Sequence, residues 1–407
     1  MKSLICTVWI FYASSSFAAS ILIPMDEHQA NHLKAYGLAY FTLEHDTEVS
    51  WLLNYRGGSF ILDYSALVET ECIARGVSFE IISAAQANTI LQGISGLSVN
   101  MDIAHMGKAP RIAVYSPRNE IIEDETDAVI LVLDYAEIPY DIIYDPEVLD
   151  DRLMMYDWLH LHHEDFTGQV DRFNWRESQI LEKELQIQNA KTLGFASVPD
   201  MKAEVVRKIR AFLAGGGYLF AMCSGAETFD LSLSVLDDAI NPFIHPLPNP
   251  DLHYDKTLAF HNFQLIPGHQ RRYSDINIDR SFRQELGYFT LFEFSAKYDL
   301  VPAILTQNHE HVIKEFFGLT TAFNKYTVKS TVTTLGENSE DGFVRYVCGE
   351  FGMGHWSYYS GHDPERNNFR GGDWAPTDLN LCPNSPGYRL ILNNVLFPSA
   401  NKKKRKT

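Results

Sequence analysis

The sequence Gly-Gly-Gly-Tyr-Leu-Phe-Ala-Met-Cys-Ser-Gly-Ala-Glu-Thr-Phe occupies residues 215–229 and decides the fold class. The three glycines are typical of a helix end. Tyr218–Met222 is an apolar run of strand length, and small residues lead from it into a helical pattern. A buried strand followed at once by a helix is the repeating unit of a parallel α/β sheet. The stretch therefore predicts an α/β fold with Cys223 at the carboxyl end of a strand.

The alternation of strand and helix patterns extends through most of the chain. Before residue 109 it predicts strands at 21–24, 49–54 and 78–82, helices at 28–43, 65–75 and 84–94, and an irregular linker at 95–108. After residue 109 the pattern predicts strands at 112–115, 140–144, 158–161 and 218–222. It predicts helices at 125–136, 176–191, 201–214 and 226–236. We therefore expect an N-terminal α/β region over 19–108 and a main domain over 109–400, with a mainly parallel sheet between two helix layers.

The last part of the chain departs from this alternation. Residues 241–300 are rich in Pro, Asn and Asp, which predicts an insertion or lid. Strand patterns return at 301–305, 343–348 and 355–359, and Ser385–Leu396 predicts a closing helix. Residues 401–407 are a basic tail, which we interpret as solvated.

The first 18 residues have the pattern of a signal peptide. Lys2 supplies a positive charge, residues 4–13 are mostly apolar, and Ser16-Phe17-Ala18 has small residues at the two positions that a signal peptidase reads. We predict cleavage after Ala18 and export to the periplasm or the extracellular space. The alternative is a buried first strand. No later run reaches the roughly 18 apolar residues of a transmembrane segment.

Composition limits the function classes. Lys and Arg number 34 against 52 Asp and Glu, which gives a formal charge of −18. Such an acidic chain is unsuited to nucleic acid, which requires a concentrated basic surface. Hydrophobic residues make up 45% of the chain, enough for a large core. We expect a small-molecule substrate, and the sequence does not indicate an oligomeric state. Cleavage leaves four cysteines and no C-x-x-C motif, with room for one disulfide.

The junction at Cys223 predicts a nucleophile elbow. In this turn a strand passes sharply into a helix, the nucleophile is displayed at the sheet edge, and its neighbours must be small, as Ser224 and Gly225 are. The helix N-terminus lowers a thiol pKa below its usual value of about 8.5, and its free N–H groups can hold an oxyanion. The alternative is a buried structural cysteine, which is common in apolar strands.

A second polar segment, Ser-Gly-His-Asp-Pro-Glu at residues 360–365, also follows a predicted strand. A thiolate nucleophile requires a base, and the base requires an orienting carboxylate. His362 can be the base, with Glu365 or Asp363 as its partner. A polar turn with a hydrogen-bonded histidine is the alternative.

A third segment, His-Leu-His-His-Glu-Asp at residues 160–165, follows the strand at 158–161. His162, His163 and Glu164 could line a polar substrate pocket or bind zinc. Because adjacent strand residues point to opposite faces, one segment cannot easily supply a closed site, and we expect no bound metal. The chain also lacks the nucleotide-binding glycine motifs, so we expect no cofactor. In a parallel sheet all three segments would share one edge. His28 and His32 are interpreted as surface residues.

Around Cys223 and His362 the chain resembles the class I glutamine amidotransferase-like superfamily, which has a flavodoxin-like sheet, a cysteine elbow and a histidine–glutamate pair. As a whole it resembles a family of exported Bacteroidetes-type proteins named asparagine synthetase B. The matching stretches are HLKAYG (32–37), WLLNYRGGSF (51–60), YAEIPY (135–140), YDWLHLHHEDFTGQ (156–169), FAMCS (220–224), GHDPE (361–365) and NSPGYRLILNNVLFP (384–398). The chain lacks the S-G-G-x-D-S loop of ATP-dependent asparagine synthetases.

Together these patterns predict an exported Cys-dependent hydrolase, similar to amidotransferases, that acts on an amide or related acyl group. Cys223 would be the nucleophile, His362 the base and Glu365 its orienting partner. Ser224, Gly225, His162, His163, Glu164 and Asp363 would bind the oxyanion or the substrate. Two other functions stay open. One is a non-catalytic module with the same fold that binds a carbohydrate or another polar ligand among His162, His163, Glu164 and His362, and the other is a metal-dependent hydrolase built on the histidine segment.

Overall fold

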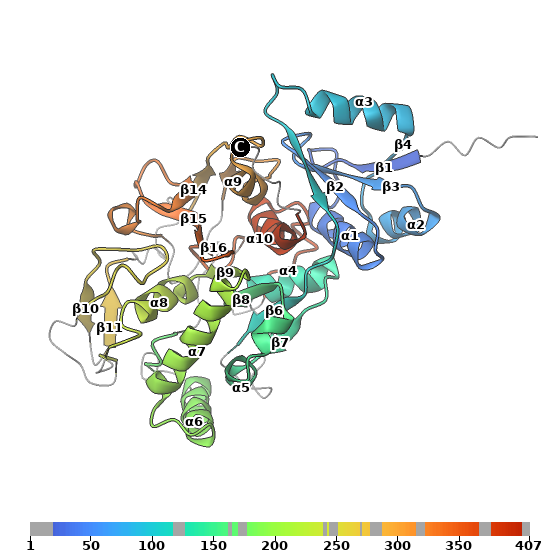
Figure 1. Ribbon diagram of the computed structural model, residues 1–407. Helices are drawn as coiled ribbons and strands as arrows, with labels where there is room; N and C mark the ends of the chain where they lie inside the picture. The colour runs from blue at the N-terminus through green and yellow to red at the C-terminus, as the bar shows by residue number, and fades with distance from the viewer. Residues whose placement is uncertain are drawn as a thin grey trace, which may run out of the picture.

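The computed structural model describes residues 19–116, 127–161, 165–169, 177–238, 242–243, 251–268, 271–276, 287–314, 322–365 and 376–400. Within these ranges the chain forms two large β-sheets, a short hairpin and helices that pack on both sheets, so the fold is mixed α/β. Figure 1 shows the N-terminal sheet as the blue elements on the right and the larger sheet in the middle of the molecule. The predicted signal peptide and basic tail lie outside the described residues.

The N-terminal sheet is antiparallel throughout, in the order β4-β1-β3-β2-β5. A parallel arrangement was expected here, and the short turn at residues 54–58 explains the difference. Gly57 and Gly58 have positive φ values of 73° and 89°, and they belong to a turn that sends the chain straight back, whereas parallel neighbours need a long crossover. The predicted linker at 95–108 is also wrong, because it contains an edge strand. The strands are β1 (Ala19–Ile23), β2 (Val49–Leu53), β3 (Ser59–Asp63), β4 (Glu80–Ser83) and β5 (Asp102–Met106).

Three helices cover this sheet, and each begins at a side-chain cap. The oxygens of Asn31, Ser65 and Ser83 each accept a hydrogen bond from a backbone N–H of the first turn. One small core lies under α3 and contains Leu22, Leu52 and Ile82, and the opposite face joins the main core of the protein. The helices are α1 (His32–Glu44), α2 (Ala66–Arg75) and α3 (Ala84–Ile94).

The larger sheet has nine strands within the described residues, in the order β13-β12-β14-β15-β16-β9-β8-β6-β7. The pairings among β7, β6, β8, β9 and β16 are parallel, and the remaining four pairings are antiparallel. The sheet is therefore mixed and not mainly parallel, because the chain beyond the insertion returns by hairpins. The strands are β6 (Ile112–Tyr115), β7 (Asp141–Ile143), β8 (Trp158–Leu161), β9 (Tyr218–Met222), β12 (Phe289–Leu291), β13 (Val312–Ile313), β14 (Thr333–Glu337), β15 (Val344–Phe351) and β16 (Gly354–Tyr359).

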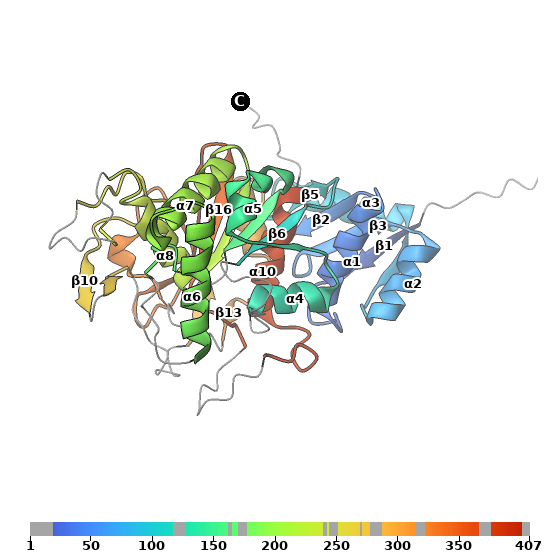
Figure 2. The ribbon, with the colours of Figure 1, turned by 90° about the horizontal axis from the view of Figure 1, so that it is seen from below.

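Helices pack on both faces of the larger sheet. Side chains alternate along each strand, so Phe220 and Met222 join the core that also contains α1, α4 and α10, and Leu219 and Ala221 join the core under α7 and α8. Figure 2 shows α10 between the two sheets and α7 on the side of α8. The helices are α4 (Ala128–Ala136), α5 (Asp145–Leu149), α6 (Glu177–Thr192), α7 (Val198–Ala214), α8 (Ser224–Leu233) and α10 (Pro386–Leu396).

The predicted strand at 301–305 is a short helix, α9 (Leu300–Leu305). An apolar run of this length does not distinguish strand from helix, and Pro302 in the first turn suits a helix because that turn does not use its N–H groups. The predicted insertion contains a hairpin of β10 (Leu265–Gly268) and β11 (Arg271–Ser274), together with β12 of the main sheet. Among the described residues, no helix is both long enough and apolar enough to cross a membrane.

One hydrophobic core runs across both sheets, because α1 packs directly on α4 and α10. The approach to α4 is close: a Cβ atom placed on Gly37 of α1 would lie 1.7 Å from the carbonyl oxygen of Ala136. Near the chain end, Met106 of β5 forms a β-bridge with Ala400. The two parts of the sequence are therefore packed as one body.

A buried arginine joins the two parts. Arg389 of α10 is fully buried and donates hydrogen bonds to the carbonyl oxygens of Met25 (3.0 Å) and Gly57 (2.7 Å) in the N-terminal region. Its remaining partners are the Tyr36 hydroxyl and Nδ1 of His309, which lies 2.9 Å away. All of these partners can be electrically neutral. The guanidinium charge is therefore stabilised by the dipoles of hydrogen-bonded carbonyl, hydroxyl and imidazole groups.

His32 belongs to the same cluster, so its interpretation as a surface residue is wrong. Its side chain is buried and stacks on the ring of His309, with ring centroids 4.1 Å apart. Burial and the nearby Arg389 charge lower the pKa of His32 to about 3 and the pKa of His309 to about 4. His28 is exposed, as expected.

We predict that Gly37→Ala destabilises the protein by about 1–3 kcal/mol, because the added methyl group must push α1 away from α4. Gly93→Ala is the matched control, since Gly93 is an exposed residue of α3 and an added methyl group there would have no atom within 4 Å. That variant should gain about 0.5–1 kcal/mol from helix propensity. Urea unfolding measures both, and equal effects of the two substitutions would contradict the packing argument.

We also predict acid-dependent stability from the histidine cluster. Both histidines titrate lower in the folded protein than the ordinary value of 6.5, so the unfolded chain takes up protons first. The stability is present above pH 6.5 and is lost as the pH falls toward 4. The amide of His309→Gln can still accept from Arg389 but does not titrate. The slope of the free energy of unfolding against pH should therefore be smaller in this variant than in the wild type, by up to about 1.4 kcal/mol per pH unit. Identical slopes for the two proteins between pH 6 and 4.5 would refute this account.

Candidate functional site

Three neighbouring parallel strands end at the same edge of the larger sheet. In β8, β9 and β16, Leu161 pairs with Ala221, and Tyr359 pairs with Met222. The Cys223 N–H continues this ladder by donating to the Tyr359 carbonyl oxygen over 3.2 Å. The segments that follow β8, β9 and β16 therefore begin side by side, at the carboxyl edge where ligands bind in α/β sheets.

Cys223 has a backbone conformation that ordinary residues avoid. It lies between the last residue of β9 and the first residue of α8, with φ 52° and ψ −133°. A positive φ in a residue with a side chain costs of the order of 1–3 kcal/mol and is concentrated at functional sites. This is the shape of a nucleophile elbow, a sharp strand-to-helix turn. The Cys223 side chain is buried, with 1% of its surface exposed.

Helix α8 is enclosed along its whole length, and all ten of its residues are buried. Two of them are acidic and hold the inserted segment. Asp230 accepts hydrogen bonds from the backbone N–H groups of residues 258, 259 and 260, and Glu227 accepts one from the Ser274 hydroxyl of β11 over 2.7 Å. Burial raises the pKa of Asp230 to about 6 despite these donors. The insertion is therefore bound to the helix that begins at Cys223.

The chain that follows β8 is attached to the first turns of α8. The Thr228 hydroxyl donates to the Ser224 carbonyl oxygen (2.8 Å) and accepts from the Phe166 N–H (3.1 Å). Phe166 is buried, and its ring packs edge-on against Phe229 of the same helix. One hydroxyl thus connects the elbow helix with the segment leaving the neighbouring strand.

The turn after β16 carries the proposed base. Gly361 has a φ of 90°, and His362 is half-buried. Asp363 is buried and accepts hydrogen bonds from the Glu365 N–H (3.0 Å), the Tyr388 hydroxyl (3.0 Å) and the Thr377 hydroxyl (2.5 Å). Asp363 therefore fixes the turn to its support, and its hydrogen bonds go to groups other than the imidazole of His362.

The structure describes six of the nine residues predicted for the site, all on the segments that follow β9 and β16: Cys223, Ser224, Gly225, His362, Asp363 and Glu365. His162, His163 and Glu164 lie outside the described residues. His160, which begins the histidine segment, is buried within the sheet. Its Nε2 lies 3.2 Å from a carboxylate oxygen of Asp127, and its Nδ1 lies 3.2 Å from the Phe220 carbonyl oxygen.

Sequence reasoning missed Asp127, Thr228 and Tyr388. Asp127 was recognisable, because it precedes the apolar helical run of α4 and caps it by accepting from two backbone N–H groups. Thr228 and Tyr388 carry no comparable local signal, since their partners lie 62 and 25 residues away in sequence.

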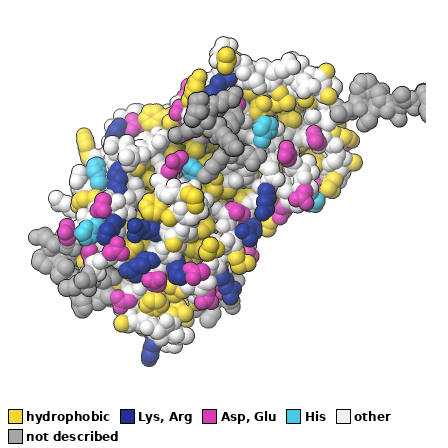
Figure 3. All heavy atoms as spheres, in the orientation of Figure 1, with side chains coloured by type: hydrophobic (Ala, Val, Ile, Leu, Met, Phe, Trp, Pro, Cys, Tyr) yellow, Lys and Arg dark blue, Asp and Glu magenta, His cyan; other side chains and the backbone are white. Residues whose placement is uncertain are grey.

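Among the described residues, the one group of three side chains close enough to hold a metal ion is Asp26, Glu27 and His28, in the loop between β1 and α1. Asp26 already pairs with Arg56 over 2.6 Å. On the face shown in Figure 3, Lys and Arg side chains lie among Asp and Glu side chains. Among the described residues of this face, no large patch carries charges of only one sign.

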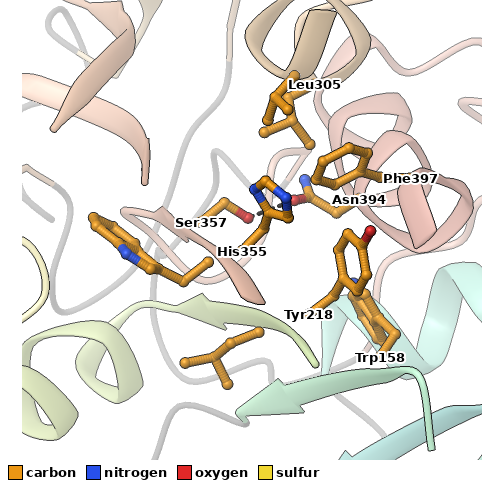
Figure 4. Close-up of a pocket in the computed structure, with 10 residues that line it drawn as sticks. Trp158, Tyr218, Leu305, His355, Ser357, Asn394 and Phe397 are labelled. Carbon is orange, nitrogen blue, oxygen red and sulfur yellow. Dashed lines mark hydrogen bonds between the residues drawn. The ribbon is translucent and has the colours of Figure 1, made fainter. Parts of the chain in front are cut away.

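A small cavity of about 10 Å³, with room for about one water molecule, lies at the other end of these strands. Trp158, Tyr218 and His355, near the starts of β8, β9 and β16, line it together with Asn394 and Phe397 of the C-terminal segment (Figure 4). Ser357 and Asn394 share a hydrogen bond at its wall. Because it lies at the amino ends of the strands, this cavity is separate from the candidate site at Cys223.

No family model and no curated protein matches the sequence. Similar solved structures include the cytoplasmic protein STM3548 from Salmonella typhimurium, with TM-score 0.36 and 11% identity over 72% of this chain and 100% of that one. The cytoplasmic protein STM1381 from Salmonella typhimurium LT2 has TM-score 0.34 and 12% identity over 71% and 99%. Gan42B, a GH42 β-galactosidase from G. stearothermophilus, has TM-score 0.30 and 12% identity over 63% and 28%. These similarities are too distant to indicate a function.

Proposed function

We propose that the protein is an exported Cys-dependent hydrolase that acts on an amide or related acyl group, with Cys223 as its nucleophile. The observation that carries the proposal is the backbone of Cys223. A cysteine held at positive φ between a buried strand and a helix is the arrangement that displays a nucleophile at a sheet edge. A cysteine that only filled the core would not need this strained conformation.

The surrounding fold supports the same interpretation. Helices pack on both faces of the parallel strands β6, β8, β9 and β16, as expected for a three-layer domain of the class I glutamine amidotransferase-like type. In this interpretation the parallel strands β6–β9 and β16 form the amidotransferase-like sheet, and the antiparallel strands β12–β15 are an extension of it beyond β16. The resemblance to the exported family named asparagine synthetase B agrees with this assignment, and the missing ATP loop separates the reaction from ATP-dependent synthesis.

In the proposed reaction the Cys223 thiolate attacks the carbonyl carbon of the substrate, so that a C–S bond forms and the carbonyl π electrons move to oxygen. In this scheme the backbone N–H groups of Ser224 and Gly225, at the start of α8, would bind that oxyanion. Collapse of the intermediate breaks the C–N bond, and the amine leaves with a proton from the His362 imidazolium. Water then gives a proton to His362 and attacks the thioester, which releases the acid and regenerates the thiolate.

The segments that follow β8 and β16 supply the other groups in this scheme. His362 accepts and returns the proton, and Glu365 orients its ring and stabilises its charged form. His162, His163 and Glu164 would line the substrate pocket after β8. The scheme uses no metal and no cofactor.

Thiol reactivity tests the proposal. Burial raises the pKa of both Cys72 and Cys348 to about 12, so these thiols should react slowest with iodoacetamide. The half-buried Cys382 is the internal reference. We expect Cys223 to react roughly tenfold or more faster than Cys382 at pH 7, because a helix N-terminus and an imidazolium stabilise its thiolate. His362→Ala should remove most of that difference, and Glu365→Gln a smaller part. Mass mapping gives the ranking.

A second measurement addresses the acyl step directly. Incubation with an activated ester should leave one acyl group on Cys223, and Cys223→Ala should abolish the adduct. A Cys223 that is the least reactive thiol and forms no adduct would contradict the proposal. The near-complete burial of Cys223 favours the second candidate in that case, a non-catalytic module that binds a polar ligand at the same edge.

Export is a separate part of the proposal. Protein isolated from the native host should begin at Ala19, or within a residue or two of it, because residues 1–18 have the signal-peptide pattern. N-terminal sequencing makes the measurement, and an intact Met1 on cytoplasmic protein would be incompatible with export.

A further inference from the structure

We infer that Tyr388, in the first turn of α10, is a positioning residue for the His362 base and acts through Asp363. The inference rests on the proposed function of Cys223 and His362. It assigns Asp363 a role different from the two considered from sequence, because Asp363 would neither orient the imidazole directly nor bind substrate. It also assigns a role to the first turn of α10, for which the sequence predicted no site residue.

The hydrogen bonds of Asp363 point to support of the turn. One carboxylate oxygen accepts from the Glu365 N–H and the Tyr388 hydroxyl, each over 3.0 Å, and the other accepts from the Thr377 hydroxyl. The Glu365 bond closes a turn within the segment itself. The other two bonds fasten this turn to groups outside it. Because Asp363 directly follows His362 in the chain, these bonds restrain the backbone from which the His362 side chain extends.

The first turn of α10 also touches the same segment sterically. A Cβ atom on Gly387 would lie 2.3 Å from the Cβ atom of Pro364. Only a residue without a side chain allows this approach, so the helix and the turn lie against each other without intervening atoms. Tyr388 and Gly387 therefore hold adjacent residues of the turn, one by a hydrogen bond and one by contact.

Tyr388 is itself firmly placed. Its N–H donates to the side chain of Ser385, which caps α10, and its own side chain is fully buried. Burial and the neighbouring Asp363 raise the pKa of Tyr388 far above 10, so the hydroxyl stays protonated and donates to the carboxylate. The next residue, Arg389, is bonded to the N-terminal region. Tyr388 therefore lies between two fixed residues of α10, the capping Ser385 and the hydrogen-bonded Arg389.

The test is Tyr388→Phe, which removes one hydroxyl and leaves the ring. We expect the midpoint of the pH profile for Cys223 alkylation to rise by about one unit, which lowers the rate below the midpoint by about tenfold. Acylation by the activated ester should fall through kcat with little change in KM. Thr377→Val removes a different donor to Asp363 and should shift the profile in the same direction.

The matched control is Tyr36→Phe. Tyr36 is also fully buried, and its hydroxyl donates to Asn393 and accepts from Arg389, away from the turn. A general loss of stability would appear in this variant too, whereas the alkylation profile should stay at the wild-type position. If Tyr388→Phe does not fold, Thr377→Val carries the test alone.

The outcomes separate the two proposals. If His362→Ala shifts the alkylation profile and neither Tyr388→Phe nor Thr377→Val does, the positioning inference is wrong and the proposed function stands. If wild-type Cys223 shows no enhanced reactivity, the proposed function fails and the inference fails with it. A shift in Tyr36→Phe equal to that in Tyr388→Phe would show that the effect is general loosening, which also overturns the inference.

Discussion

The burial of the Arg389 guanidinium is the constraint on which the joining of the two sheets depends. A buried cation is costly unless its N–H groups are hydrogen-bonded. The terminal N–H groups of Arg389 donate to the carbonyl oxygens of Met25 and Gly57 in the N-terminal region, while its Nε has no hydrogen-bond partner among the described residues. The β1–α1 loop and the turn between β2 and β3 must therefore reach α10. This requirement brings His32 onto His309 and sets α1 against α4 and α10 in one core. An arginine without a carboxylate partner thus fixes how the N-terminal sheet is attached.

The candidate site depends on that attachment only indirectly, through α10. Its parts come from three places in the sequence: the segment after β8, the elbow at Cys223 and the turn at 360–365. The parallel register of β8, β9 and β16 brings their starting points together. Helix α8 is then covered by the insertion through Asp230 and Glu227, and the turn is supported by α10 through Asp363. Buried carboxylates, each satisfied by backbone or hydroxyl donors, make both attachments.

Local sequence patterns predicted the secondary structure correctly where residues close together in the sequence determine it. The apolar run Tyr218–Met222, the capped helix after Ser385 and the small residues at the elbow all have the predicted secondary structure. Prediction failed for the N-terminal sheet because the strand at Ser59–Asp63 was not predicted, so its antiparallel return beside β2 after Gly57 and Gly58 was missed. Prediction also failed where contacts between residues far apart in the sequence decide the structure. The burial of His32 likewise depends on Arg389, 357 residues later, and the support of Asp363 by Tyr388 depends on a helix formed after the turn.

The position of β16 has a consequence for how the protein folds. Strand β9 needs β16 as its neighbour, yet the two are separated in sequence by the whole of the insertion and the hairpins. The last described residue, Ala400, still pairs with Met106. Strand β9 therefore keeps an open edge until residues 354–359 have been synthesised, and α1 lacks its partner α10 until residues 386–396 have followed. Contacts of such long sequence separation slow folding and leave apolar edges exposed meanwhile. The pairing of β16 with β9, which completes the sheet beside the elbow, is therefore expected to be a late step in folding.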